Sequence, residues 1–150
     1  MAIKHSLYLR YFSVDDLTQV YNLACQALSE RYDPTLFMTI SSSWPEGFIV
    51  VGSPSGIKAF ILGVTTSPMS ARILMFAVCP EMRGMGIGTI LMGRFLEECR
   101  KKGIRVVSLE VRKSNNAAIR FYYKAGFQSV DVIRHYYNDG EDAYLMQMFL

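Results

Sequence analysis

A glycine-rich segment between an apolar run and a long helical pattern constrains this fold most. Residues 73–78 are apolar, and residues 79–86 after them contain two glycines. Residues 87–102 then place an apolar side chain at every fourth position, end in three basic residues and are followed by Gly103. This combination predicts a helix whose C-terminus is stabilised by the basic residues and capped by the glycine. A strand, a glycine loop and a helix therefore follow one another in that order.

The glycine loop has the composition of an anion-binding turn. Glycines let successive backbone N–H groups face an oxyanion, the helix N-terminus adds partial positive charge, and Arg83 adds a full charge. A P-loop is excluded because no Gly-Lys-Ser/Thr follows. A dinucleotide-binding loop is excluded because Thr89 stands where its third glycine belongs. From these residues alone, a phosphate-binding turn and a flexible turn with close packing remain equally open.

The rest of the chain alternates short strand patterns with helical ones. Strands are expected where apolar or alternating runs lie between turn residues, over 7–11, 48–51, 57–64, 73–78, 106–111, 127–137 and 143–149. Helices are expected after the N-cap Ser13 to about residue 28, and over 34–43, 87–102 and 116–125. There is no internal repeat and no linker composition, so residues 1–150 should form one domain of the mixed α/β or α+β class.

Composition and charge narrow the class of protein. The chain has 150 residues, of which 51% are hydrophobic and 19% charged, which is typical of a globular domain with a large core. A net charge of +3 is too small to indicate a nucleic-acid binder, and no apolar run is long enough for a membrane span. The three cysteines show no CxxC spacing, so neither a disulfide framework nor a zinc site is expected. We therefore expect a cytoplasmic protein without a metal, a nucleic-acid partner or a membrane partner.

The glycine loop is part of a wider resemblance. Arg83-x-x-Gly86-x-Gly88 resembles the acyl-CoA pyrophosphate motif of the GNAT family of N-acetyltransferases, in its usual place between a strand and a long helix. Within that family the chain is most similar to the catalytic subunit of NatA-type and archaeal N-terminal (Nα) acetyltransferases. The bacterial ribosomal-protein alanine acetyltransferases come next. The segments that carry this similarity are residues 28–32, 43–45, 108–115, 121–127 and 136–144.

The resemblance implies a fold and a reaction. The GNAT fold is a central mixed, mostly antiparallel sheet of about seven strands flanked by about four helices. The implied reaction transfers the acetyl group of acetyl-CoA to the N-terminal α-amine of proteins or nascent peptides, by direct attack in a ternary complex and without a metal. Two alternatives stay open: an acetyltransferase for a single ribosomal protein or a small amine, and a non-catalytic acyl-CoA-binding module. The sequence leaves open whether a ribosome or an auxiliary subunit takes part.

The resemblance assigns catalytic roles to two carboxylates and a phenol. A base is needed because the pKa of an α-amine is about 7.7 to 8.0, so that most of it is ammonium at neutral pH. Glu110 is the first candidate, although the strand pattern by itself favours an ordinary exposed carboxylate. Glu30, in the loop after the first helix, is the second, and the two would cooperate through water. Tyr122 occupies the family's position for the acid that hydrogen-bonds the departing CoA thiolate.

The resemblance also implies a site for acetyl-CoA. The strand before the loop would face the thioester oxygen, the loop would hold the pyrophosphate, and Asn115 would bind the pantetheine or phosphate portion while capping the next helix. The residues assigned to acetyl-CoA are Phe76, Ala77, Val78, Arg83, Gly84, Met85, Gly86, Ile87, Gly88, Thr89, Asn115 and Tyr122. Cys79 raises the alternative of an acetyl-cysteine intermediate. The sequence places no base beside it, so we interpret Cys79 as a packing residue.

Four residues resemble those that hold the first backbone units of a peptide substrate between two loops: Glu30, Tyr32, Tyr136 and Tyr137. For Tyr136 and Tyr137 the alternative is an aromatic pair at the end of a sheet. As strand neighbours they would face opposite ways, so one of them, Tyr136 in preference, is expected to point into the site. A tight pocket there would favour Ser, Ala or Thr as the first residue of the substrate.

Overall fold

Strands of one sheet form the centre of the computed structural model, which describes residues 6–27 and 33–150. Within these residues the seven strands are β1 (Tyr8–Tyr11), β2 (Phe48–Ser53), β3 (Gly56–Ser67), β4 (Ser70–Val78), β5 (Val106–Arg112), β6 (Gln128–Ile133) and β7 (Ala143–Phe149). They lie in the order β1-β2-β3-β4-β5-β7-β6. Neighbours in the described sheet are antiparallel, except that β4 and β5 are parallel. The predicted mixed, mostly antiparallel sheet is confirmed.

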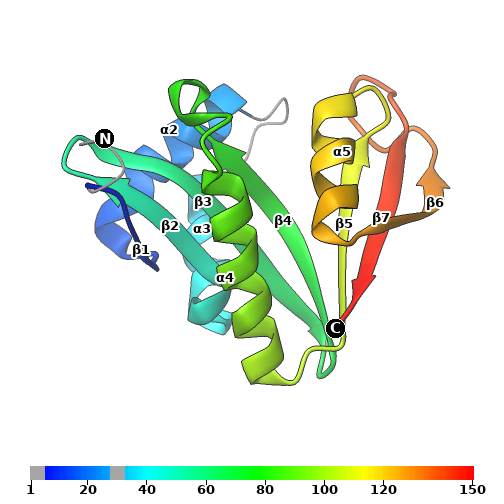
Figure 1. Ribbon diagram of the computed structural model, residues 1–150, viewed down its shortest axis with the longest axis horizontal. Coiled ribbons are helices and arrows are strands. Elements are labelled where there is room, and N and C mark those ends of the chain that lie inside the picture. The colour runs from blue at the N-terminus through cyan, green and yellow to red at the C-terminus, as the bar shows by residue number, and fades with distance from the viewer. Residues whose placement is uncertain (1–5, 28–32) are drawn as a thin grey trace.

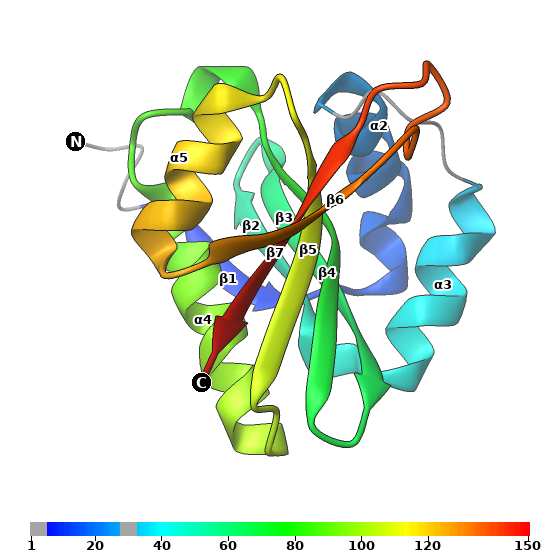
Figure 2. The ribbon, with the colours of Figure 1, turned by 90° about the vertical axis from the view of Figure 1, so that its right-hand side faces the viewer.

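Helices cover both faces of this sheet. In the described residues there are four α-helices, α2 (Leu17–Ala27), α3 (Pro34–Ser43), α4 (Ile87–Lys102) and α5 (Asn116–Ala125), with 3₁₀ turns at Val14–Asp16, Pro45–Gly47 and Pro80–Met82. Helices α2 and α3 lie on one face, whereas α4 and α5 lie on the other (Figure 1, Figure 2). None of the helices described here is both long and apolar enough to cross a membrane.

Aromatic side chains fill the core on both faces of the sheet. The ring centroid of Phe37 in α3 lies 6.3 Å from Phe48 and 6.4 Å from Phe60, and all three side chains are fully buried. On the other face, Phe95 of α4 packs against Trp44 at 5.7 Å. Burial of a large apolar side chain contributes roughly 1.5–3 kcal/mol to stability. These contacts therefore hold both helix layers against the sheet.

The sheet opens between β4 and β5. Among the described residues, these two strands pair through residues 70–72 of β4 and residues 106–108 of β5, and the register continues no further. Beyond that point β4 stays paired to β3 and β5 stays paired to β7, so the strands diverge like the arms of a V (Figure 1). We call this region, residues 73–78 of β4 and 109–112 of β5, the fork. Each arm of the fork therefore has one edge that none of the described strands covers.

The strand predicted over residues 127–137 is present as β6, but its predicted end was wrong. β6 ends at Ile133, because His135 has a φ of 54°, a left-handed conformation that interrupts an extended strand. The backbone N–H of His135 donates to Asp142, and its ring lies 3.2 Å from the carbonyl oxygen of Gly140. Residues 134–142 therefore form a loop between β6 and β7, which we call the tyrosine loop because it carries Tyr136 and Tyr137.

Candidate active site

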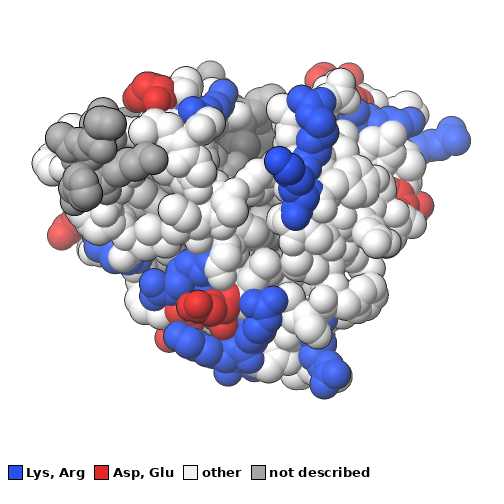
Figure 3. Space-filling model, viewed as in Figure 1, with Lys and Arg blue, Asp and Glu red and all other residues white. Residues whose placement is uncertain are grey.

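A cavity of about 810 Å³ lies in the fork. It is lined by the end of α2 at Ala27, the fork residues of β4 and β5, the glycine loop, the first turn of α4, and α5. Figure 3 shows the molecule hollowed between α4 and α5, with Lys and Arg side chains on the rim. A hollow of this size with a few polar groups among apolar ones is typical of a small-molecule site.

The glycine loop meets the N-terminus of α4 on one side of the cavity. Gly84 and Gly86 have φ values of 78° and 80°, in the left-handed region that glycine adopts without steric cost. A Cβ at either position would meet nothing within 4 Å, so the space beside the loop is open. The first N–H groups of α4 have no helical partner, because the helical hydrogen bonds begin with Ile90 donating to Gly86. The loop thus presents backbone donors to an open space.

Arg83 adds a positive charge beside this helix start. Its Nε donates to the carbonyl oxygen of Val78 at 3.1 Å, which holds the side chain against the end of β4. The residue is exposed and lines the cavity. Backbone donors, a helix N-terminus and a guanidinium together fit a phosphate or pyrophosphate group.

Most of the residues predicted for acetyl-CoA line this cavity. Met85 does not: it lines a second cavity of about 250 Å³ beside β1 and β2. The members of the predicted set that line the main cavity are Phe76, Ala77, Val78, Arg83, Gly84, Gly86, Ile87, Gly88, Thr89, Asn115 and Tyr122. The structure therefore brings together residues of β4, the loop, α4 and α5 that are far apart in the sequence.

On the β5 arm of the fork, Glu110 forms a polar cluster with Arg72 and Tyr136. Nε of Arg72 lies 2.9 Å, and Nη2 lies 2.6 Å, from Oε1 of Glu110. Nη2 also donates to the hydroxyl of Tyr136 at 2.7 Å, and that hydroxyl lies 3.4 Å from the same Oε1. The Glu110 side chain lines the cavity and is 12% exposed. It is therefore a largely buried, paired carboxylate and not the exposed one that the strand pattern favoured.

Tyr122 lies in an aromatic cluster at the wall of the cavity. Its ring centroid is 5.6 Å from Phe121, 5.8 Å from Phe127 and 6.3 Å from Phe76. Burial raises the pKa of the Tyr122 hydroxyl well above its ordinary value. The phenol is therefore protonated at neutral pH and is a hydrogen-bond donor. Tyr123, the next residue, is half exposed, as expected for a side chain that points elsewhere.

Asn115 combines the two roles that the sequence allows. Its Oδ1 accepts a hydrogen bond from the backbone N–H of Ala118 at 3.2 Å, which caps α5. The residue also lines the cavity. Because the cap uses the side-chain oxygen, the amide NH₂ is the group that remains for a ligand.

Cys79 directly follows the β4 arm. Its side chain is buried, and burial raises the pKa of the thiol, as does the nearby carboxylate of Glu81. A thiol that stays protonated is a poor nucleophile. The structure agrees with the interpretation of Cys79 as a packing residue.

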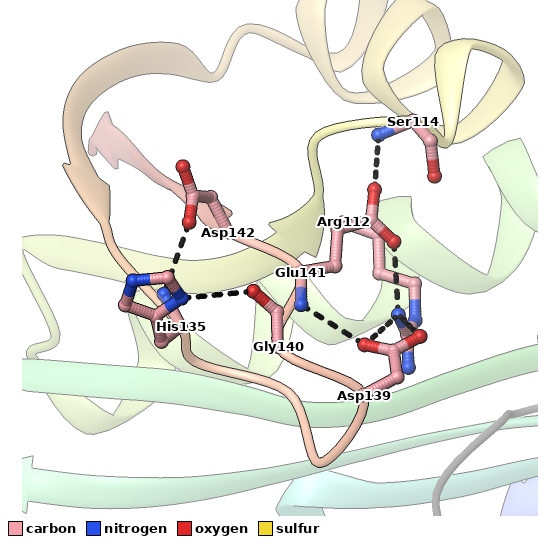
Figure 4. A network of polar contacts seen from close by, with 7 residues as sticks. All are labelled: Arg112, Ser114, His135, Asp139, Gly140, Glu141 and Asp142. Atoms are coloured by element: carbon pink, nitrogen blue, oxygen red, sulfur yellow. Dashed lines mark hydrogen bonds and ion pairs between the residues drawn. The ribbon is translucent and has the colours of Figure 1, made fainter.

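An ion-pair network fixes the tyrosine loop to the end of β5. Nη1 of Arg112 lies 2.9 Å from carboxylate oxygens of both Asp139 and Glu141, and Glu141 also accepts from the backbone N–H of Ser114 at 2.8 Å (Figure 4). The guanidinium of Arg112 also lies over the ring of Tyr137. The loop is therefore bound to the strand that carries Glu110.

Both tyrosines of this loop are at the site. Tyr137 lines the cavity, and Tyr136 reaches Glu110. Their rings meet edge to face with centroids 5.0 Å apart. As the strand alternation predicted, one of the two lines the cavity, but it is Tyr137 and not the preferred Tyr136, which contacts Glu110 instead. Both residues lie in a loop, so the alternation of a strand does not determine which of them faces the cavity.

Comparison with known proteins identifies the family. Residues 14–127 match the Acetyltransferase (GNAT) family. The chain belongs to this family. An N-alpha-acetyltransferase from Sulfurisphaera tokodaii is 31% identical to this chain over 150 residues, and the alignment covers 92% of this chain and 90% of the relative. A putative ribosomal protein bS18-alanine N-acetyltransferase from Bacillus subtilis is 31% identical over 139 residues, covering 92% of each chain.

A solved structure extends this similarity to three dimensions. Ard1 from Thermoplasma volcanium superposes on this chain with a TM-score of 0.93 and 39% identity, covering 97% of this chain and 98% of that one. The predicted GNAT fold, the acetyltransferase class and the resemblance to Nα-acetyltransferases and bS18-alanine acetyltransferases are confirmed.

Two residues of the predicted GNAT site, Glu30 and Tyr32, lie outside the described residues. Two further residues at the site, Arg72 and Arg112, were not predicted from the sequence. The sequence holds a signal for Arg72, since a charged residue at the start of an otherwise apolar strand is unusual. It holds no such signal for Arg112. Among the side chains that the structure describes, no group of His, Cys, Asp or Glu could hold a metal ion.

Proposed function

We propose that this GNAT enzyme transfers the acetyl group of acetyl-CoA to the N-terminal α-amine of proteins, by direct attack within a ternary complex. The observation that carries the proposal is the fork cavity, which joins an anion-binding loop at one end to Glu110, Tyr122 and Tyr137 within a single hollow. A cofactor phosphate and a reacting amine would therefore share one site. Relatives named N-alpha-acetyltransferase support the choice of amine.

The residues around the cavity fit acetyl-CoA. The pyrophosphate would lie against the backbone donors of Gly84, Gly86 and the start of α4, with Arg83 beside it. The NH₂ group of Asn115 would bind the pantetheine or phosphate portion. The uncovered edge of β4 at residues 76–78 would offer backbone donors to the thioester oxygen. Acetyl-CoA supplies an acetyl group activated as a thioester, and the protein supplies orientation and proton transfer.

Glu110 would accept the proton that the α-amine must lose before it attacks. Its side chain lines the cavity and is largely buried, which supports this role. Glu30 would be a second carboxylate that shares this task through water. Tyr122 would donate a hydrogen bond to the sulfur of the leaving thiolate, since burial keeps its hydroxyl protonated. Burial thus supports the neutral, hydrogen-bond-donating form of Tyr122 that this role needs.

The tyrosine loop would hold the first backbone units of the peptide. The hydroxyl of Tyr136 and the ring of Tyr137 lie on the same side of the cavity as Glu110. With Glu30 and Tyr32, which the family resemblance also assigns to the peptide, they would confine the first side chain to a small space. The substrates would be peptides or nascent chains that begin with Ser, Ala or Thr after removal of the initiator Met.

A peptide panel tests the proposal. Peptides that differ only at residue 1 are incubated with enzyme and acetyl-CoA, and products are identified by mass spectrometry. We expect acetylation of Ser-, Ala- and Thr-initiated peptides and none of the same peptides with a blocked N-terminus and a free lysine. Faster turnover of polyamines or lysine side chains would contradict the proposal. Initial rates should give intersecting lines, as a ternary complex requires, whereas parallel lines would indicate a covalent intermediate.

A further inference from the structure

Arg72 stands where the sheet begins to open. It is the last residue of β4 that pairs with β5, opposite Ser108. Glu110 is two residues further along β5, and so on the same face of the sheet as Ser108. The Arg72 side chain therefore reaches diagonally across the closed end of the fork to Glu110.

The contacts of Arg72 are concentrated on one oxygen of Glu110. Two guanidinium nitrogens lie 2.9 and 2.6 Å from Oε1, and the hydroxyl of Tyr136 adds a third contact at 3.4 Å. The described residues make no hydrogen bond to Oε2. A carboxylate held through one oxygen cannot rotate freely, and its second oxygen remains able to accept a proton.

The same guanidinium connects this carboxylate to the tyrosine loop. Nη2 of Arg72 donates to the hydroxyl of Tyr136 at 2.7 Å, and this hydroxyl in turn donates to Glu110. The three side chains come from β4, β5 and the tyrosine loop, and they form a closed triangle of charge-assisted hydrogen bonds. The position of the loop and the orientation of the carboxylate are therefore coupled through Arg72.

We propose that Arg72 is a positioning residue of the acetyl-transfer reaction, which fixes Glu110 through Oε1 so that Oε2 is left to take the proton of the substrate amine. The inference rests on the proposed function, in which Glu110 is the base. Arg72 itself touches neither reacting group in this scheme. Its effect on the reaction passes through Glu110, and in part through Tyr136.

The alternative is that Arg72 is an ordinary stabilising ion pair, and the chain offers a matched control for it. Arg10 and Asp16 also pair at 2.6 Å, with side chains 38% and 6% exposed, against 35% and 12% for Arg72 and Glu110. Arg10 lies on β1, at the far end of the sheet from the fork. Arg10→Gln therefore removes a comparable ion pair without disturbing the site.

The test is steady-state acetylation of a Ser-initiated peptide by Arg72→Gln, Arg10→Gln, Glu110→Gln and the double variant Arg72→Gln/Glu110→Gln. We expect Arg72→Gln to lower kcat by roughly 10- to 100-fold, the scale of a misplaced catalytic group, with the KM for acetyl-CoA unchanged. Arg10→Gln should keep wild-type kcat. The double variant should be no slower than Glu110→Gln, because Arg72 has no effect once the carboxylate is gone.

The outcomes separate the two proposals. Suppose first that Glu110→Gln is impaired. The positioning role is then wrong if Arg72→Gln keeps wild-type kcat, or if it lowers kcat by the same factor in the wild type and in Glu110→Gln. The proposed function stands in either case. If Glu110→Gln keeps wild-type kcat, both the base assignment and the role of Arg72 are wrong. Should Arg72→Gln fail to fold, Arg72→Lys gives the same comparison, because it keeps the charge but loses the planar pair of donors.

Discussion

The guanidinium of Arg112 lies 4.0 Å from the ring centroid of Tyr137, and two carboxylates of the loop that carries this tyrosine bind the same guanidinium. Arg112 is the last residue of β5, so the end of a rigid strand determines where the ring lies. Cation–π contact and ion pairing therefore act together on the tyrosine loop. The ring of Tyr137 is consequently held at the cavity before any ligand binds.

Replacement of Arg112 should weaken peptide binding more than cofactor binding. Arg112→Gln removes both the cation–π contact and the ion pairs that hold the tyrosine loop, so it should raise the KM for peptide several-fold. The KM for acetyl-CoA should change by less than about 2-fold, because the glycine loop is unaffected. Lys113→Gln is the control, since Lys113 is exposed and lies 5.7 Å from a different ring, that of Tyr144. An equal rise in both KM values would contradict this division.

Gly86→Asp should abolish binding of acetyl-CoA in isothermal titration calorimetry. The substitution places a side chain and a negative charge beside the backbone donors at the start of α4. Gly103→Asp is a matched control at the other end of the same helix, with a φ of 87° and equally open space. Both variants carry the same backbone strain, about 1–2 kcal/mol, but Gly103→Asp should bind normally. Normal binding by a folded Gly86→Asp protein would refute the anion site.

Glu110→Gln and Tyr122→Phe should each lower kcat by roughly 10²- to 10⁴-fold, the usual range for loss of a general base or acid. The KM for acetyl-CoA should change little, because neither group belongs to the glycine loop. Tyr123→Phe is the control for Tyr122, since it removes the same hydroxyl from the next, half-exposed residue. A Tyr122→Phe variant as active as Tyr123→Phe would exclude the acid role.

The pH dependence separates the two carboxylates. For the wild type, kcat/KM should rise with pH and level off near the amine pKa of about 8. In Glu110→Gln the lost activity should partly return at high pH, where free amine needs no base. If instead Glu110→Gln is nearly normal at neutral pH while Glu30→Gln is not, Glu30 is the main base.

If Tyr122 is the acid, its ionisation should limit activity at the alkaline end of the same pH profile. Burial raises the pKa of its hydroxyl above the ordinary value of 10, so the neutral donor form persists at higher pH than for a free phenol. Loss of activity from its ionisation should therefore begin above pH 10. A decline that starts below pH 9 in the wild type and is absent in Tyr122→Phe would show that the phenol ionises early.

Thiol chemistry tests the acetyl-cysteine alternative. Cys25 is exposed, whereas Cys79 and Cys99 are buried, and burial raises the pKa of Cys99 to about 12. One thiol should therefore react quickly with an aromatic disulfide reagent in the folded protein, and three after unfolding. Cys79→Ser should retain kcat within about 3-fold, since a packing residue tolerates a small replacement. A Cys79→Ser variant without activity but with a normal unfolding temperature would restore the covalent route.

Local signals explain most of what the sequence predicted correctly. The basic residues at the end of α4 and Gly103 determine where that helix ends. The glycine loop directly before α4 has the composition of an anion-binding site. These features involve residues close together in the chain, so composition and spacing reveal them. The family resemblance then placed Glu110, Tyr122 and Asn115, all of which line the cavity.

Non-local contacts explain what the sequence did not predict. The Arg72–Glu110 pair joins residues 38 positions apart, and it exists because β4 and β5 pair briefly before they separate. The alternation of apolar and polar residues within each strand does not predict where the two strands separate. The end of β6 was misplaced for a related reason. Residues 134–137 have strand-like side chains, but His135 is bonded to acceptor oxygens of Asp142 and Gly140, and its backbone turns there.

The fork also has a consequence for folding. Strands β2, β3 and β4 form one part of the sheet and can associate through short connections. Strands β5, β6 and β7 form the other part, in which β6 and β7 are a hairpin beside β5. The two parts pair with each other through residues 70–72 and 106–108, and α4 lies between these segments in the sequence. Pairing these segments closes the long loop that contains α4. The entropy cost of this closure makes the step slow, and the few hydrogen bonds formed stabilise the junction only weakly. We expect this junction to form late in folding and to open first in native-state hydrogen exchange. The cavity, and the acetyltransferase activity with it, would then appear only when the two preformed parts join.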